Sequence, residues 1–186
     1  MSLLWRLFAF WLGFLKKETT QEGSMIFRFT NTAPHTLKEI EKLLKHQSPG
    51  RENATVDAAQ IDRALANPNF YLYVAEINEP AKAYGFAGMA SVFIQHNAVR
   101  TIAEVHDVVV LPEFRGRGIA RSLMEALHAS VQAHANDLHQ SIKIYLTSRP
   151  SRVEANRLYQ KLGYTLVARA DGEWGTNLYK MVISPR

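Results

Sequence analysis

The stretch Arg115-Gly116-Arg117-Gly118-Ile119-Ala120 joins a strand-like segment to a helical one. The residues before it, 105–110, are rich in β-branched side chains, and Leu111-Pro112-Glu113 interrupts them. After it, apolar residues recur every fourth position, as on one face of a helix: Ile119, Leu123, Leu127 and Val131. We therefore predict a strand, a short glycine-rich turn and a long helix that ends at about residue 136.

This turn has the features of an anion-binding site. Gly116 and Gly118 allow the backbone to approach a ligand closely, and the first N–H groups of the following helix have no acceptor within it. Arg115 and Arg117 add positive charge where the helix dipole already attracts anions. We predict that residues 115–120 bind a phosphate or pyrophosphate group.

Two common nucleotide-binding motifs do not fit this turn. The chain contains no Gly-x-x-x-x-Gly-Lys-Ser/Thr run. The dinucleotide fingerprint would require a small residue at Arg121, and a carboxylate after the next strand, where the chain has Thr147-Ser148-Arg149. The pattern that remains is Arg-x-x-Gly-x-Ala, formed by Arg115, Gly118 and Ala120.

With a second pattern downstream, the chain resembles the GNAT superfamily of acyl-CoA-dependent N-acetyltransferases. The second pattern is Ala-x-x-Leu-Tyr-x-x-x-Gly-Tyr, from Ala155 to Tyr164, and it looks like the tyrosine-bearing helix of that family. The resemblance covers roughly residues 25–183. It implies an α/β fold with a mixed, mostly antiparallel sheet of about six to seven strands, about four flanking helices and a splayed central strand pair.

The resemblance also implies that acetyl-CoA is the acyl donor. The donor's pyrophosphate is expected on the turn, and its pantetheine arm on the backbone of residues 108–110. Many family members carry Asn where this chain has Arg152, and this arginine could contact the CoA phosphates or face solvent. The expected donor-binding residues are Val108, Val109, Val110, Arg115, Gly116, Arg117, Gly118, Ile119, Ala120, Arg121, Arg152, Asn156 and Tyr159.

A base is needed for transfer to an amine, because an amine of pKa around 10 arrives mostly as ammonium. Alternation along the strand before the turn predicts Asp107 on one face. On the other face it predicts Glu104, His106, Val108 and Val110. Glu104 stands where lysine-acetylating family members carry their general base, and histidine side chains titrate near neutral pH. We expect Glu104 and His106 to be catalytic, and which of Glu104, His106 or Asp107 relays the proton stays open.

Tyr159 is expected, by resemblance, to be the general acid that protonates the departing CoA sulfur. The alternative is an aromatic residue that packs beside Leu158 and Leu162. The chain has no cysteine and no Gly-x-Ser-x-Gly run, so an acyl-enzyme is not expected. We predict direct attack of a primary amine on acetyl-CoA in a ternary complex.

The acceptor is expected to be a small amine or an amino-acid-like molecule, read by residues 34–70, 95–101 and 170–176. A protein or peptide amine (a lysine or an N-terminus) and a non-catalytic acyl-CoA-binding regulatory module are the alternatives, and a homodimer is compatible with either. The net charge of +5 comes without a nucleic-acid motif or a block of like charge, so we expect no nucleic-acid partner. The histidines do not share a helix face at ligand spacing, so we expect no metal.

Residues 1–24 differ in composition from the catalytic domain, which we place at residues 25–186. Residues 3–15 are mostly apolar but too short, as a helix, to span a bilayer about 30 Å thick. They fit a peripheral membrane anchor, a helix that packs on the domain or a partner, or a vector-derived leader before Met25. We expect a cytoplasmic protein, with the membrane anchor as the alternative.

The remaining elements follow from local patterns. Capping-box patterns at Thr36 and Asp57 predict helices that run to about residues 45 and 67. Gly85 and Gly88, inside a strand, suggest a bulge or a close approach of a ligand. Further strands are predicted at residues 26–29, 70–77, 84–95, 102–110, 142–147, 164–168 and 177–183, and a last helix at residues 152–162, closed by Gly163.

Overall fold

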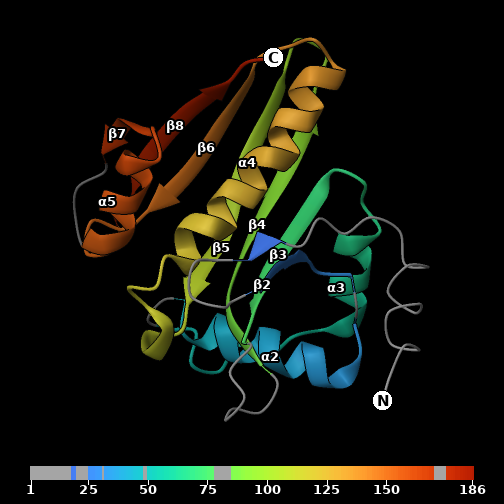
Figure 1. The fold of residues 1–186 in the computed structure, drawn as a ribbon, viewed down its shortest axis with the longest axis vertical. Helices are drawn as coiled ribbons and strands as arrows, with labels where there is room; N and C mark the ends of the chain where they lie inside the picture. The colour runs from blue at the N-terminus through green and yellow to red at the C-terminus, as the bar shows by residue number, and fades with distance from the viewer. Residues whose placement is uncertain (1–17, 20–24, 31, 48–49, 78–84, 170–174) are drawn as a thin grey trace.

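The computed structural model describes residues 18–19, 25–30, 32–47, 50–77, 85–169 and 175–186. These residues form one eight-stranded sheet with the strand order β1-β2-β3-β4-β5-β6-β8-β7 (Figure 1). The strands are β1 (Glu18–Thr19), β2 (Met25–Arg28), β3 (Phe70–Glu76), β4 (Phe86–His96), β5 (Thr101–Val110), β6 (Ile142–Ser148), β7 (Thr165–Arg169) and β8 (Asn177–Ile183). The helices are α2 (Pro34–Lys45), α3 (Ala58–Leu65), α4 (Ile119–Asp137) and α5 (Val153–Lys161), with a short 3₁₀ turn at Pro112–Phe114.

This arrangement confirms the predicted α/β class. All neighbouring strands are antiparallel except β5 and β6, which are parallel. The seven strands after the two-residue β1 match the predicted sheet, and the four helices of the described residues match the predicted helices.

The two predicted capping boxes have different outcomes. Asp57 is the N-cap of α3, and its carboxylate accepts from the Ala59 N–H at 2.9 Å, as predicted. The prediction at Thr36 is wrong, because α2 begins two residues earlier, at Pro34. Proline suits the first turn of a helix, since it has no N–H to leave unpaired. Glu39 accordingly bonds outside its helix and accepts from the Phe86 N–H at 3.1 Å.

A bulge in β4 lies beside Gly88, as the glycine pair predicted. Ala75 pairs with Gly88 and Glu76 with Phe86, which leaves Ala87 as the extra residue. The close approach at Gly88 is made by protein: a Cβ added there would lie 2.7 Å from the Val109 carbonyl oxygen. Gly88 therefore lets β4 and β5 lie close together.

The predicted splay is between β5 and β6. The two strands pair at three positions only: Ile102 with Lys143, Ala103 with Ile144, and Glu104 with Tyr145. Beyond these positions they separate, as Figure 1 shows. The second half of β5 consequently presents backbone groups that no β6 residue among those described takes up.

The two faces of the sheet carry different helices. Tyr73 pairs with Ala90, and its hydroxyl meets Ser130 of α4 at 2.9 Å, so α4 covers the face to which both residues point. Ser91 is next along β4 and points to the other face, where α2 packs on β4 and β5. The central strands are buried from both sides, and β4 is almost wholly inaccessible from Phe86 to Val92. This core fixes the position of β5, which lines the site.

The apolar segment 3–15 lies outside the described residues, as do residues 20–24 of the predicted linker. Glu18 and Thr19 pair with Ile26 and Met25, at the edge of the sheet. Within the described part of the chain, no helix is long and apolar enough to cross a membrane.

Candidate functional site

The turn at residues 115–120 leads into the N-terminus of α4 through two glycines in the left-handed region. Gly116 has φ 79° and Gly118 has φ 78°, a conformation that L side chains rarely adopt. The first helical hydrogen bond runs from the Ser122 N–H to the Gly118 carbonyl at 3.1 Å, so the amides of residues 119–121 precede it. Glycine has no side chain with which to cap them, and these N–H groups can bind an anion.

A cleft of about 1040 Å³ begins at this turn and extends between β5 and α5. Its lining includes most of the expected donor-binding residues, namely Val108, Val109, Val110, Arg115, Gly116, Gly118, Ile119, Ala120, Arg121, Arg152 and Tyr159. The cleft is lined by seven Lys or Arg residues and by two Glu residues. This excess of positive charge suits a ligand with several phosphates. The volume is also large enough for a nucleotide-sized ligand.

Tyr159 lies on α5 with its side chain only 2% exposed and lining the cleft. Its ring packs against those of Tyr179 and Tyr164, with centroids 5.9 and 6.1 Å away. Burial raises the pKa of the Tyr159 phenol, and the positive charge of Arg152 opposes that shift. The phenol therefore keeps its proton at neutral pH, as a general acid must before it acts.

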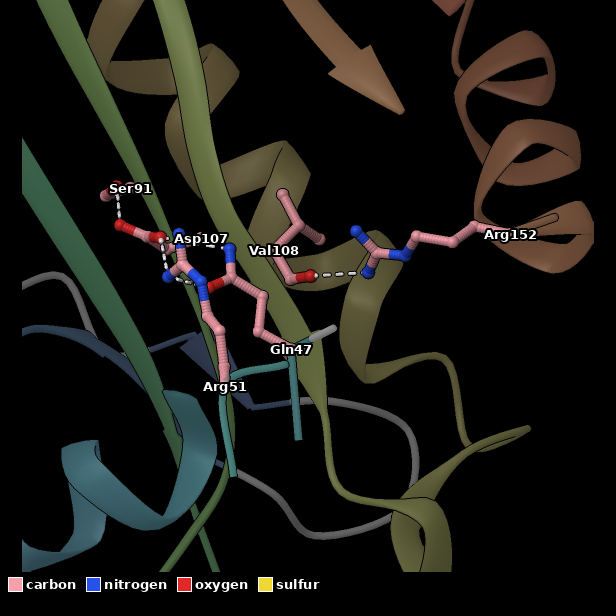
Figure 2. A network of polar contacts seen from close by, with 6 residues as sticks. All are labelled: Gln47, Arg51, Ser91, Asp107, Val108 and Arg152. Carbon is pink, nitrogen blue, oxygen red and sulfur yellow. Dashed lines mark hydrogen bonds and ion pairs between the residues drawn. The ribbon is translucent and has the colours of Figure 1, made fainter. Parts of the chain in front are cut away.

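Arg152 bridges the open side of the splay. It is the N-cap residue of α5, and its Nη2 donates to the Val108 carbonyl oxygen at 3.0 Å (Figure 2). The guanidinium therefore lies on the side of the cleft that β5 forms, beside the backbone of that strand. The sequence suggested that Arg152 contacts the CoA phosphates or faces solvent. The contact with the Val108 carbonyl is neither of these.

Asp107 and Val108 form a bulge in β5. Met89 pairs with Val109 and Ser91 with His106, so the two bulge residues lie opposite Ala90 alone. Asp107 has φ 52°. The alternation predicted from the sequence is therefore wrong beyond His106, because one extra residue shifts every later side chain to the other face.

The Asp107 carboxylate is held on the side of the sheet that faces α2. Gln47 Nε2 donates to Asp107 Oδ1 at 3.0 Å, and the hydroxyl of the buried Ser91 lies 3.5 Å from Oδ2. Arg51 Nη1 lies 3.9 Å from Oδ1 and also donates to Gln47 Oε1 at 2.6 Å. Figure 2 shows Gln47 and Arg51 reaching Asp107 on one side of β5, and Arg152 reaching Val108 on the other.

Glu104 and His106 lie next to each other on β5 but do not line the cleft. Glu104 Oε2 is 3.6 Å from His106 Nε2, and both side chains are about half exposed. Because His106 pairs with Ser91, the pair lies on the same side of the sheet as Asp107. The three proton-relay candidates therefore share one face of the sheet, the face on which α2 packs, and none of them lines the cleft.

Two expected donor-binding residues are held away from the cleft by contacts elsewhere. Arg117 donates to the Glu113 carbonyl at 3.3 Å, and its guanidinium lies 5.2 Å from the centre of the Phe114 ring. Asn156 donates to the Arg149 and Pro150 carbonyls at 3.0 and 3.3 Å, which stabilises the turn before α5. Neither side chain lines the cleft.

Other lining residues had no signal in the sequence. Lys45, His46 and Gln47 reach the cleft from the end of α2, although they belong to no motif. Among the described residues, no group of three or more His, Cys, Asp or Glu side chains is arranged to hold a metal ion.

The family assignment follows from a domain match. A model of the acetyltransferase (GNAT) domain matches residues 68–166, just over half of the chain. The chain belongs to the GNAT acetyltransferase family. The matched part of this GNAT domain contains the bulges of β4 and β5, the glycine turn and the tyrosine helix. No curated protein sequence matches the chain.

Several solved structures share the GNAT fold. The chain is 15% identical to NAA60 of Arabidopsis thaliana in complex with a bisubstrate analogue (TM-score 0.65, covering 87% of this chain and 99% of that one). It is 17% identical to a chain of the NatC complex bound to Gag peptide and CoA (TM-score 0.67, covering 88% and 99%). It is 19% identical to an aminoglycoside 6'-N-acetyltransferase in complex with coenzyme A (TM-score 0.65, covering 87% and 98%). Identities this low establish the fold alone.

Proposed function

We propose that this GNAT domain transfers an acetyl group from acetyl-CoA to a primary amine, by direct attack in a ternary complex. The observation that carries the proposal is Tyr159, a buried phenol with a raised pKa in the cleft that begins at the glycine turn. An anion site and a proton donor in one cleft suit a phosphorylated thioester whose leaving sulfur must be protonated.

The chain's own residues suit the donor along its length. The amides at the start of α4 and the side chains of Arg115 and Arg121 suit the pyrophosphate. The backbone of residues 108–110, left without a β6 partner, suits the amide groups of the pantetheine arm. Acetyl-CoA bound in this way would direct its thioester toward Tyr159 and Val108.

The attacking ammonium must lose its proton to a base within reach. We propose the Glu104–His106 pair, whose side chains lie 3.6 Å apart and are open to solvent. The amine nitrogen then forms a bond to the acyl carbon, and the carbon–sulfur bond breaks. Tyr159 donates its proton to the departing sulfur and regains one from solvent.

We propose a small, amino-acid-like amine as the acceptor. Asp107 and Arg51 present opposite charges 3.9 Å apart, on the face that also carries Glu104 and His106. A carboxylate beside a guanidinium matches an ammonium group beside a carboxylate. GNAT neighbours include a complex with a peptide and an aminoglycoside acetyltransferase, so peptide and aminoglycoside amines belong in the test.

Tyr159→Phe tests the reaction. We expect kcat to fall about 100-fold, a typical contribution of a general acid. CoA affinity should change little, because the variant keeps the ring and its contacts with Tyr164 and Tyr179. The measurement is CoA release from acetyl-CoA with a panel of amino acids, small amines, aminoglycosides and peptides, alongside a CoA titration.

Three results of this panel would count against the proposal. Undiminished turnover in Tyr159→Phe would remove Tyr159 from the mechanism. Donor binding without turnover on any amine would point to a regulatory acyl-CoA-binding module. Turnover on peptides alone would replace the small acceptor by a peptide.

A further inference from the structure

We propose that Arg152 is a catalytic residue, which places a positive charge beside the thioester during acetyl transfer. The inference rests on the proposed function and deepens it, because it concerns the same cleft. It assigns Arg152 to the reacting end of the donor and leaves the phosphates to other basic residues.

The position of Arg152 is the first support. From the start of α5 the side chain crosses the splay to the Val108 carbonyl, 44 residues away in sequence, with a 3.0 Å hydrogen bond. A guanidinium has five N–H donors in a planar fork, and this bond uses one of them. The others can meet a second oxygen at the same place. In Figure 2 the guanidinium lies against β5 while α5 holds its backbone.

The direction of the donor is the second support. The pyrophosphate site lies at the start of α4, which follows β5 after the 3₁₀ turn and the glycine turn, and the arm would run back along the strand. Val108 is two residues before Val110, about 7 Å further from the phosphates at a rise of 3.3 Å per residue. Arg152 therefore meets the strand at the thioester end of the cleft. Arg115 and Arg121, at the other end, suit the phosphates.

The electrostatic coupling to Tyr159 is the third support. Tyr159 and Arg152 both line the cleft, and the charge of Arg152 opposes the rise that burial gives the pKa of the Tyr159 phenol. The ionisable residues packed against Tyr159 are Tyr164 and Tyr179, which carry no charge as phenols. Arg152 is therefore the cation that acts at the same place as the proposed acid.

Negative charge develops at that place during the reaction. When the amine adds to the acyl carbon, the electron pair of the C=O bond moves to the oxygen; when the C–S bond breaks, its electron pair moves to sulfur. Arg152 stabilises both negative charges without transferring a proton. Tyr159 supplies the proton to sulfur, and the base on the other face removes one from the amine. A charge fixed in position before the reaction favours the transition state over the bound substrate.

The test compares Arg152→Gln, Arg152→Lys and the control Arg186→Gln. Arg186 lies after β8, is exposed and does not line the cleft, and its substitution removes the same charge. For Arg152→Gln we expect kcat to fall about 100-fold, as for loss of one transition-state donor, with the KM for acetyl-CoA changed less than about threefold. Arg152→Lys should recover part of kcat, and Arg186→Gln should behave as the wild type.

The pH dependence of kcat distinguishes an effect of the Arg152 charge from a packing role of its side chain. In Arg152→Gln the pKa of Tyr159 loses the effect that lowers it, so the alkaline limb of kcat should move to higher pH. A mere packing role would leave that limb in place.

Other results would overturn the inference. A higher KM for acetyl-CoA with unchanged kcat would assign Arg152 to the phosphates. Tighter CoA binding with unchanged kcat would make it a competitor of the donor for the Val108 carbonyl. The wild type must turn over an amine before these variants are compared, so failure of the proposed function would appear in the wild type itself.

Discussion

Asp107 combines an unfavourable backbone conformation with several polar contacts. For a residue other than glycine, φ 52° costs roughly 1–2 kcal/mol, and Asn and Asp tolerate it best. Its carboxylate is held by Gln47 and lies beside Ser91 and Arg51. These contacts offset the strain and keep the bulge in place, next to the backbone that we assign to the donor.

Substitutions at Asp107 should separate strain from contact. Asp107→Ala keeps the backbone strain and loses the contacts of the carboxylate. We therefore expect its free energy of unfolding to be about 1–3 kcal/mol lower than that of the wild type. Asp107→Asn keeps an oxygen for Gln47 and tolerates the conformation, so it should lose less. Urea denaturation measures both. Equal stability of the two variants would mean that the contacts do not stabilise the bulge.

At the scale of elements, the site depends on two strand pairs: β4 and β5 lie close together, whereas β5 and β6 separate after three paired positions. β4 and β5 approach so closely that Gly88 has no room for a Cβ against the Val109 carbonyl. On its other side β5 leaves β6 after Glu104. The tight pair fixes the backbone of residues 108–110, and the open pair makes it accessible.

Gly88→Ala should disturb this arrangement. The new methyl would lie 2.7 Å from a backbone oxygen, so β5 must shift, and we expect a loss of about 1–3 kcal/mol together with weaker CoA binding. Gly85→Ala is the matched control, because the nearest atom there, at 3.0 Å, is the flexible carboxylate end of Glu39. Thermal denaturation and CoA titration compare the two. A milder effect at Gly88 than at Gly85 would contradict this account of the strand spacing.

At the scale of the whole molecule, one half-buried histidine links α4 to Tyr164, which lies between α5 and β7. His128 lies 2.9 Å from the Tyr164 hydroxyl, and burial lowers the pKa of its imidazole from 6.5 to about 4. The fold therefore holds His128 neutral. Below about pH 6.5 the unfolded chain takes up a proton that the folded chain refuses, so stability falls until about pH 4.

Between pH 7 and pH 5, we expect the titration of His128 to lower the free energy of unfolding by about 2 kcal/mol. Burial also lowers the pKa of His134, which acts in the same direction, so the contribution of His128 is read by difference. His128→Gln can keep a hydrogen bond to Tyr164 without titrating, and it should lose less stability over that range. Urea denaturation at both pH values measures the difference. Parallel losses in the two proteins would show that His128 does not titrate as described.

Much of the fold could be predicted from the sequence because its signals are local. The glycine turn, the four-residue spacing of α4 and the tyrosine pattern of α5 each lie within one or two elements. They sufficed for the α/β class, and most of the donor-binding residues that they predicted line the cleft. The start of α2 could not be read from Thr36, because Pro34 offers an earlier N-terminus and the side chain of Glu39 bonds to the sheet.

The sequence by itself determined the strand–turn–helix at residues 115–120 and the place of Tyr159, since backbone preference and apolar spacing act over a few residues. Only the tertiary structure decided the bulge at Asp107, its contact with Gln47 across 60 residues, and the contact of Arg152 with Val108 across 44. Contacts at such separations depend on how sheet and helices pack together. One extra residue in β5 was enough to reverse the face of every later side chain.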